Sequence, residues 1–199
     1  MNVVETIQSF RLFDLLIILA LFAMFILGYV QGTIRRLLGI GSILFSLLLA
    51  AQLRDPLGAF LASNWTHLPK AYSYMIGMGT VFLAGSIAFS LVIQGVYKRA
   101  PLFEKATFVD EILGGLLGVL QGLLILLAII IILDPYYALV GQAENPNELG
   151  FLRGFWSAMN ESETGRVFRQ TIIPGFLSVF GFIFPAEIKA MFPGGEPGA

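Results

Sequence analysis

Few residues in this sequence could carry out chemistry. The chain contains no cysteine and one histidine, His67, so thiol catalysis and metal sites built from cysteine or histidine have almost no raw material. Ser157 and Glu161 could be combined with His67 into a catalytic triad, but no Gly-x-Ser-x-Gly nucleophile elbow is present. We therefore expect a protein that is not an enzyme and that needs neither a metal nor a cofactor.

Three glutamines occur inside or at the edge of strongly apolar segments. They are Gln31, Gln94 and Gln121, and each is followed by a glycine. An amide in lipid is costly unless it forms a hydrogen bond to another helix, so Gln121 is expected to face protein. Hydrogen bonding between helices is the favoured interpretation, and the lining of a polar path for a substrate is the alternative.

Small residues recur at helical spacing around two of these glutamines. The glycines in these patterns are Gly28, Gly32, Gly114, Gly118 and Gly122. A stripe without side-chain bulk lets another helix approach closely, which predicts close packing within a helix bundle; an interface for a partner protein is the alternative. Asp110 lies one helical turn before this stripe, and Asp14 precedes the first apolar segment. Both aspartates are predicted to be helix N-caps.

The elements that must position these residues are long apolar segments. Hydrophobic residues make up 57% of the 199-residue chain and charged residues 13%, and the mean hydropathy is +0.82. A soluble domain of this size could not bury that much apolar surface. About 20 helical residues cross a bilayer. We therefore predict an all-α membrane protein with four transmembrane helices, at about residues 14–34, 37–53, 71–97 and 112–133.

The charged residues around these spans narrow the possible functions. None of the four spans has an ionisable residue in its interior, so coupled transport lacks the relay groups that it normally uses. Only Arg35 and Arg36 separate the first two spans. This spacing predicts a tight hairpin in which both arginines reach toward the lipid headgroups.

The composition changes after residue 134. We divide the chain into a transmembrane module, residues 1–134, and an amphipathic tail, residues 135–199, that lies at or outside the membrane surface. Apolar residues between Leu149 and Met159 recur at helical spacing, which predicts a short amphipathic helix. Residues 171–184 are strongly apolar but too short to cross a bilayer, so this segment is expected to be interfacial or re-entrant.

Lysine and arginine are distributed unevenly between the links. The first and third links carry five of them, which are Arg35, Arg36, Lys98, Arg99 and Lys105. The opposite side carries three, which are Arg11, Arg54 and Lys70. The positive-inside rule therefore predicts that both termini are extracytoplasmic. The first span is expected to be a retained signal anchor. The net charge of −1 offers no electrostatic basis for nucleic-acid binding.

The spacing of these residues resembles the colicin V production protein family of bacterial inner-membrane proteins. In that family an aspartate opens the first helix, and an Arg-Gly pair and then Arg-Glu follow; here Asp14, Gly32 and Arg35 match. The last helix of the family begins Asp-Arg-x-x-Gly-x-x-x-Gly-x-x-Arg-Gly, and here Asp110 and the stripe glycines match in register. The tail around residues 172–174 is also similar.

The sequence departs from this pattern at four positions. Gln31 and Gln121 replace the arginines before glycine, Arg36 replaces the glutamate, and Glu111 replaces the arginine that follows the aspartate. The paired loss of the two arginines suggests that both interact with a common partner.

The resemblance implies a four-helix protein of the bacterial inner membrane that is needed for production or export of colicin V or, more generally, for envelope homeostasis. It implies no agreed catalytic site. The expected partners are the lipid bilayer, other membrane or secreted proteins, and a second copy of the chain. Two alternatives stay open from the residues. One is a small channel or uncoupled transporter lined by the membrane glutamines, and the other is an anchor that holds the tail at the membrane surface as a scaffold.

Overall fold

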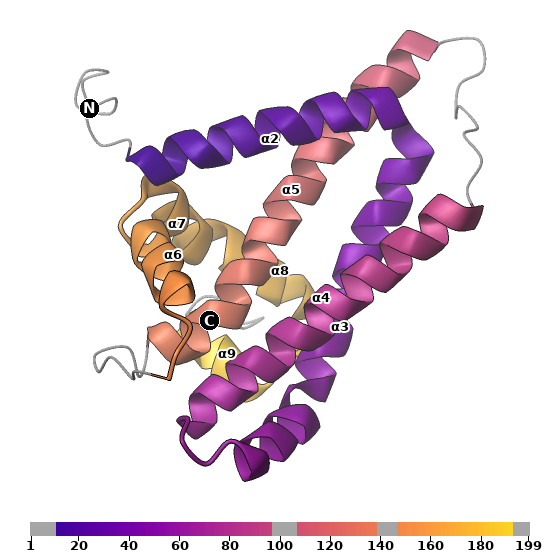
Figure 1. The fold of residues 1–199 in the computed structure, drawn as a ribbon. Helices are drawn as coiled ribbons and strands as arrows, with labels where there is room; N and C mark the ends of the chain where they lie inside the picture. The colour runs from indigo at the N-terminus through magenta and orange to yellow at the C-terminus, as the bar shows by residue number, and fades with distance from the viewer. Residues whose placement is uncertain (1–10, 97–106, 139–146, 193–199) are drawn as a thin grey trace.

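Four long helices make up most of the molecule (Figure 1). The computed structural model describes residues 11–96, 107–138 and 147–192. The long helices are α2 (Leu12–Gln31), α3 (Thr33–Asn64), α4 (Lys70–Val96) and α5 (Thr107–Tyr137). All four are long and apolar enough to cross a membrane, and the described residues contain no strand. The predicted all-α membrane fold with four transmembrane helices is therefore confirmed.

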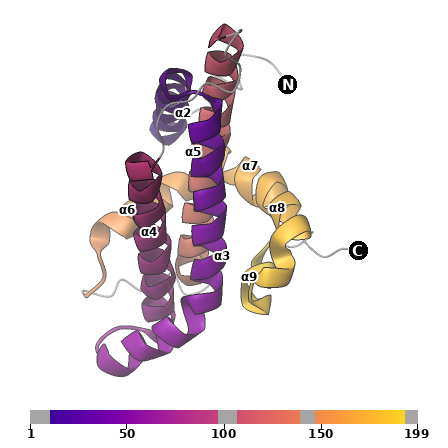
Figure 2. The ribbon, with the colours of Figure 1, turned by 90° about the vertical axis from the view of Figure 1, so that its right-hand side faces the viewer.

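Helix α3 is longer than the span predicted from the sequence. It continues beyond Leu53 through Arg54, Asp55 and Pro56 and ends at Asn64. Its 32 residues would extend about 48 Å, against a hydrocarbon core of about 30 Å, so its last turns project past the core. The helix bends in this part (Figure 2), where Pro56 removes a backbone hydrogen bond.

The helices pack in two pairs, α2 against α5 and α3 against α4, and α3 also contacts α5. Helix α5 is the most enclosed of the four, because 44% of its most apolar window is buried, against 17% for α2 and for α4. Its large buried side chains, among them Leu127, Ile130 and Ile131, belong to a core cluster that also contains residues of α3, α4 and the tail. Helix α5 therefore forms the centre of the bundle.

The predicted hairpin between the first two spans is wrong. A single residue, Gly32, joins α2 to α3, with φ of +79°, a conformation that only glycine adopts without strain. One residue is too short for the two helices to lie side by side, and they diverge from this point (Figure 1). Arg36 consequently does not reach toward the headgroups, because its side chain is buried within the bundle.

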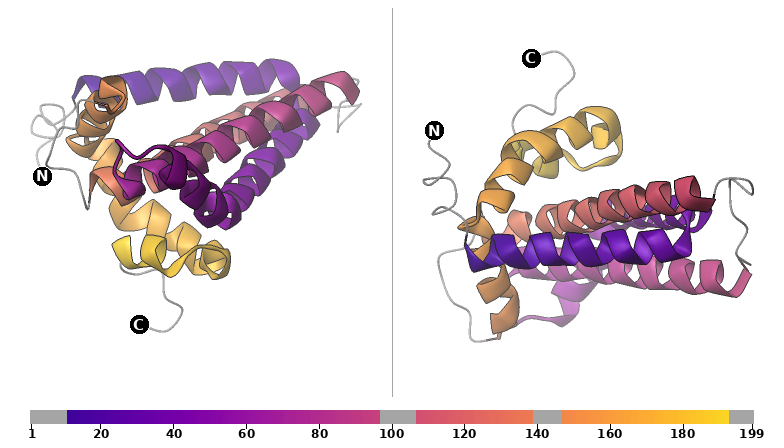
Figure 3. Two further views of the ribbon diagram at one scale, coloured as in Figure 1. Left: turned by 60° about the horizontal axis from the view of Figure 1, so that its bottom comes forward. Right: turned by 90° about the horizontal axis from the view of Figure 1, so that it is seen from above.

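The tail folds into short helices that return to the bundle. These are α6 (Gly150–Asn160), α7 (Glu163–Val167), a π-helical turn (Phe168–Ile172), α8 (Ile173–Phe180), a 3-10 turn (Gly181–Ile183) and α9 (Ala186–Met191). Figures 2 and 3 show α7 to α9 beside the long helices. Ile173, Leu177 and Ile188 are fully buried, and the Gln52 amide donates to the Ile183 carbonyl at 2.7 Å. One face of the apolar segment 171–184 thus packs on protein, whereas Val179 and Phe182 are exposed.

Candidate functional site

The small residues of α2 and α5 bring the two backbones into contact. A Cβ atom added to Gly28 would overlap the carbonyl oxygen of Gly114, and one added to Gly118 would overlap that of Met24. At Gly122 an added Cβ would lie 2.9 Å from the Leu21 side chain. The stripe therefore sets the position of α2 on α5, and only residues without a side chain fit at its centre.

The two aspartates predicted as N-caps each hold a different part of the chain. Asp110 is in the first turn of α5, and its carboxylate accepts from the Thr33 backbone N–H, in the first turn of α3, at 3.4 Å. The Thr33 hydroxyl donates to the Asp110 carbonyl at 3.0 Å. These two hydrogen bonds hold the Gly32 junction against α5, because Thr33, the residue after Gly32, is bonded to both the carboxylate and the backbone carbonyl of Asp110.

Asp14 is likewise not the N-cap of the first helix, because that position belongs to Arg11. The Asp14 carboxylate accepts from the Arg11 backbone N–H at 3.0 Å. It also accepts from the backbone N–H and the hydroxyl of Thr164, at 2.8 and 2.6 Å. Asp14 is fully buried and so joins the start of α2 to the tail. Both N-cap predictions were wrong because the helices begin earlier than expected: α2 begins at Leu12 and α5 at Thr107, so each aspartate lies within the first turn.

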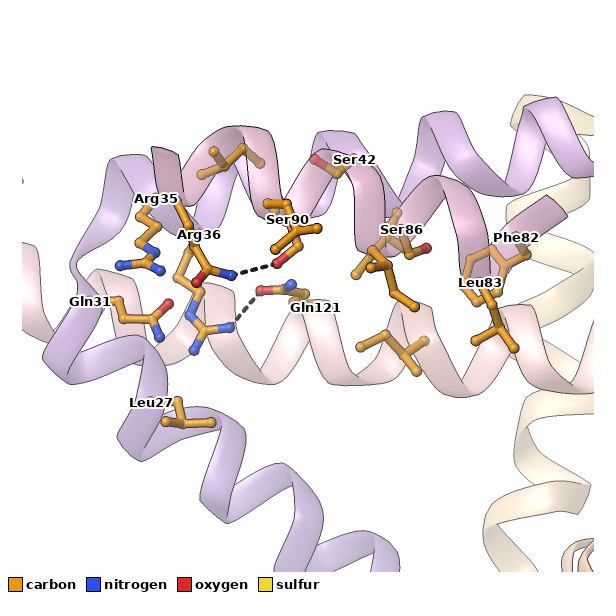
Figure 4. Close-up of a pocket in the computed structure, with 17 residues that line it drawn as sticks. Leu27, Gln31, Arg35, Arg36, Ser42, Phe82, Leu83, Ser86, Ser90 and Gln121 are labelled. Atoms are coloured by element: carbon orange, nitrogen blue, oxygen red, sulfur yellow. Dashed lines mark hydrogen bonds between the residues drawn. The ribbon is translucent and has the colours of Figure 1, made fainter. Parts of the chain in front are cut away.

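The long helices leave between them a cleft of about 580 Å³ with a mixed polar and apolar lining (Figure 4). Its walls come from α2, α3, α4 and α5, and all three glutamines singled out in the sequence line it. The polar lining residues are Gln31, Arg35, Arg36, Ser42, Ser86, Ser90, Gln94 and Gln121. The four helices thus bring together amides that lie up to 90 residues apart, and they place two arginines beside them.

Arg36 is the central polar group of this cleft. Its side chain is 5% exposed, and its Nη1 donates to the Gln121 Oε1 at 2.7 Å. Its Nε has no hydrogen-bond partner. Among the described residues, neither Arg35 nor Arg36 forms an ion pair. The guanidinium is therefore buried with a neutral amide as its main partner, which is an unfavourable environment for a charge.

The rest of the lining adds donors and no carboxylate. The Gln94 amide donates to the Ser90 hydroxyl at 3.0 Å, and the Ser86 hydroxyl is buried without a partner. The described lining residues include no aspartate, glutamate, histidine or cysteine. Such a surface can bind a negatively charged or hydrogen-bond-accepting group, but its serines have no neighbouring base in the lining to activate them.

Sequence reasoning missed a buried ion pair at the other end of α5. Asp134 is 2% exposed and accepts from Arg169 Nε and Nη2 at 2.6 and 2.8 Å. The Trp156 indole N–H donates to the same carboxylate at 2.9 Å. The available signal was Asp134 itself, a carboxylate at the end of an apolar run, since such a group requires a partner. Its partners are 22 and 35 residues away in the chain, so the sequence did not reveal them.

A second charged contact orders the start of the tail. The Glu148 carboxylate accepts from Arg153 at 2.6 Å and from the Tyr136 hydroxyl. The hydrogen bond from Arg153 to Glu148 raises the pKa of Arg153 above its usual value.

No group of three histidine, cysteine, aspartate or glutamate side chains within the described ranges is placed to hold a metal ion.

Comparison with known proteins gives one result. No curated protein and no solved structure matches the chain. A family model described as "Colicin V production protein" matches residues 13–172, from the first turn of α2 to the end of the π-helical turn. This match covers all four long helices and the cleft between them, and together with those helices it shows a multi-pass membrane protein. The chain belongs to the colicin V production protein family.

Proposed function

We propose that this protein assists toxin production and export, or envelope homeostasis, without catalysing a reaction, and that the cleft between the long helices is its functional site. The description of the family supports a role in the production of colicin V. The observation that carries the site assignment is Arg36, a buried guanidinium in a cleft whose described lining contains no carboxylate. Buried charges without ionic partners are expensive and are a mark of functional sites in membrane proteins.

The proposal places the protein in the bacterial inner membrane, with other membrane or secreted proteins as its partners. The cleft supports this proposal because residues of all four long helices line it, so a partner bound there would contact every membrane helix. The lining supplies hydrogen-bond donors and no general base among its described residues, which supports binding over catalysis.

The test is complementation in a bacterium that lacks the chromosomal copy and produces colicin V. We expect the parent chain to restore toxin in the medium and resistance to envelope stress, and Arg36→Gln to reduce both at equal protein levels. Arg11→Gln removes the same charge from an exposed ion pair with Glu161 and is the matched control. Full restoration by Arg36→Gln would show that the function does not depend on the cleft.

The second candidate function is a small channel or uncoupled transporter. It is favoured by one observation, that Gln31, Gln94 and Gln121 all line the same cleft. Measurements of ion current and solute flux on the purified protein in proteoliposomes distinguish the two proposed functions. The first proposal predicts no ion current and no solute flux, whereas flux that Gln121→Leu abolishes would replace it with the transport function.

A further inference from the structure

No carboxylate among the described residues forms an ion pair with the arginines at one end of the cleft. Arg35 and Arg36 are consecutive, and both line the cleft beside Gln31, as Figure 4 shows. Arg36 is buried, with its Nε unpartnered, and the neighbouring Arg35 is half-buried. Both begin α3, where the backbone N–H groups also favour negative charge. Asp110 lies near this helix start, where it bonds to Thr33, and it is not part of the lining.

We propose that the arginine end of the cleft binds a phosphate group, with Arg35 and Arg36 as its cationic ligands and Gln31 as an amide donor. The assignment rests on the proposed function of the cleft and names the class of ligand that it takes. Guanidinium groups suit phosphate because their planar N–H donors match two oxygens at once. A bound phosphate also compensates the buried charge of Arg36, which Gln121 alone does not.

The other end of the cleft has room for more than a phosphate group. Phe82 and Leu83 lie away from the arginines in Figure 4, and Ile87 and Ile125 extend the apolar wall. The volume of about 580 Å³ falls within the range of small-molecule sites. A phosphate at the arginine end therefore leaves the apolar end for the remainder of the ligand, as an anionic lipid would supply. Free phosphate shares the headgroup chemistry and would occupy the arginine end alone.

The experiment uses the full chain in nanodiscs and has two arms. In the first arm, radiolabelled inorganic phosphate is titrated onto protein in phosphatidylcholine discs, with chloride at matched ionic strength as the reference. In the second arm, mass spectrometry measures how much phosphatidylglycerol, relative to phosphatidylcholine, stays bound after detergent extraction. Each arm compares the parent chain with Arg36→Gln, Arg35→Gln and the control Arg11→Gln.

We expect binding in at least one arm, weakened about tenfold or more by Arg36→Gln and unchanged by Arg11→Gln. Binding in the first arm alone identifies a soluble phosphate, and selective retention of phosphatidylglycerol identifies a lipid. Absence of binding in both arms, or equal binding by the two cleft variants and the control, would overturn the inference. If Arg36→Gln fails to fold, the comparison of Arg35→Gln with the parent chain decides the result, because Arg35 is only half-buried. The assay contains no partner protein, so complementation by Arg36→Gln tests the function separately from phosphate binding.

Discussion

At the residue scale, the contact between α2 and α5 depends on glycines, which have no side chain to keep the two backbones apart. Gly28 and Gly114 bring their backbones so close that a methyl group on either would overlap the other helix. In lipid there is no hydrophobic gain from pairing two apolar helices, so close dispersion contacts and Cα–H···O contacts must hold them together. The glycines therefore stabilise the bundle by allowing the backbones of α2 and α5 to approach closely.

Gly118→Leu tests this contact. A leucine Cβ would overlap the Met24 carbonyl oxygen, so α2 must move away from α5, and we expect the free energy of unfolding to fall by about 3 kcal/mol. Thermal unfolding in detergent measures the loss. Gly41→Leu is the matched control, because nothing lies within 4 Å of a Cβ added there. Equal stability of the two variants would show that the α2–α5 contact tolerates a side chain.

A second residue-scale test concerns the Arg36–Gln121 pair. In the family pattern that this chain resembles, position 36 is a glutamate and position 121 an arginine, whereas here they are arginine and glutamine, in contact at 2.7 Å. Gln121→Arg should place two guanidinium groups together and lower the free energy of unfolding by about 3 kcal/mol. Adding Arg36→Glu should restore most of this loss. A double variant no more stable than Gln121→Arg alone would show that the two positions do not interact.

At the element scale, the tail is held to the bundle by charged groups that the long helices provide. Asp14 of α2 binds Thr164, Arg54 of α3 pairs with Glu187 at 3.0 Å, and Asp134 of α5 binds Arg169. Ile173 and Leu177 of the tail are also buried in the same apolar core cluster as residues of the long helices. Each contact joins residues more than 30 positions apart, so the tail is a part of the tertiary core.

Arg169→Gln should release the tail. It leaves Asp134 buried with only the Trp156 indole as a donor, and removal of one partner of a buried ion pair costs about 3–5 kcal/mol. We expect faster proteolytic cleavage within the tail and a lower unfolding temperature. Arg166→Gln, three residues earlier, breaks an exposed pair with Glu163 and should cost at most about 1 kcal/mol. Similar proteolysis of both variants would contradict a specific role of Asp134.

At the scale of the whole molecule, the two ends of the bundle differ in structure. The Gly32 junction and the start of α5 lie at one end, and the tail and the C-terminal end of α3 lie at the other (Figure 1). Three of the five cations that predict the orientation, Lys98, Arg99 and Lys105, lie outside the described residues. The orientation therefore stays a prediction from the positive-inside rule.

Single cysteines test the orientation, because the natural chain has none. Ser63 and Asn160 are exposed near the tail end, and Thr107 is exposed at the opposite end. With both termini extracytoplasmic, an impermeant thiol reagent on intact cells should label cysteines at 63 and 160 and not at 107. Labelling after membrane disruption confirms that all three are reactive. Labelling of position 107 alone in intact cells would reverse the orientation.

The sequence by itself determined the class of protein. Uncharged apolar segments of sufficient length predicted the four membrane helices, because the cost of backbone and charge in lipid leaves few other structures. The spacing of Asp14, Gly32, Asp110 and the stripe glycines indicated the family, which is confirmed. The stripe also predicted close helix packing, since glycines at four-residue spacing lie on one face. These are local properties, and a sequence displays them directly.

Only the tertiary structure decided which helices pair and what the cleft contains. Membrane helices are apolar on every side, so hydropathy does not identify the face that meets protein, and the stripe on α5 could not name α2 as its partner. The burial of Arg36 follows from the one-residue junction at Gly32, which turns α3 away from α2 and directs the arginine toward Gln121 of α5. Contacts across 85 residues depend on the relative placement of whole helices, which no local spacing encodes.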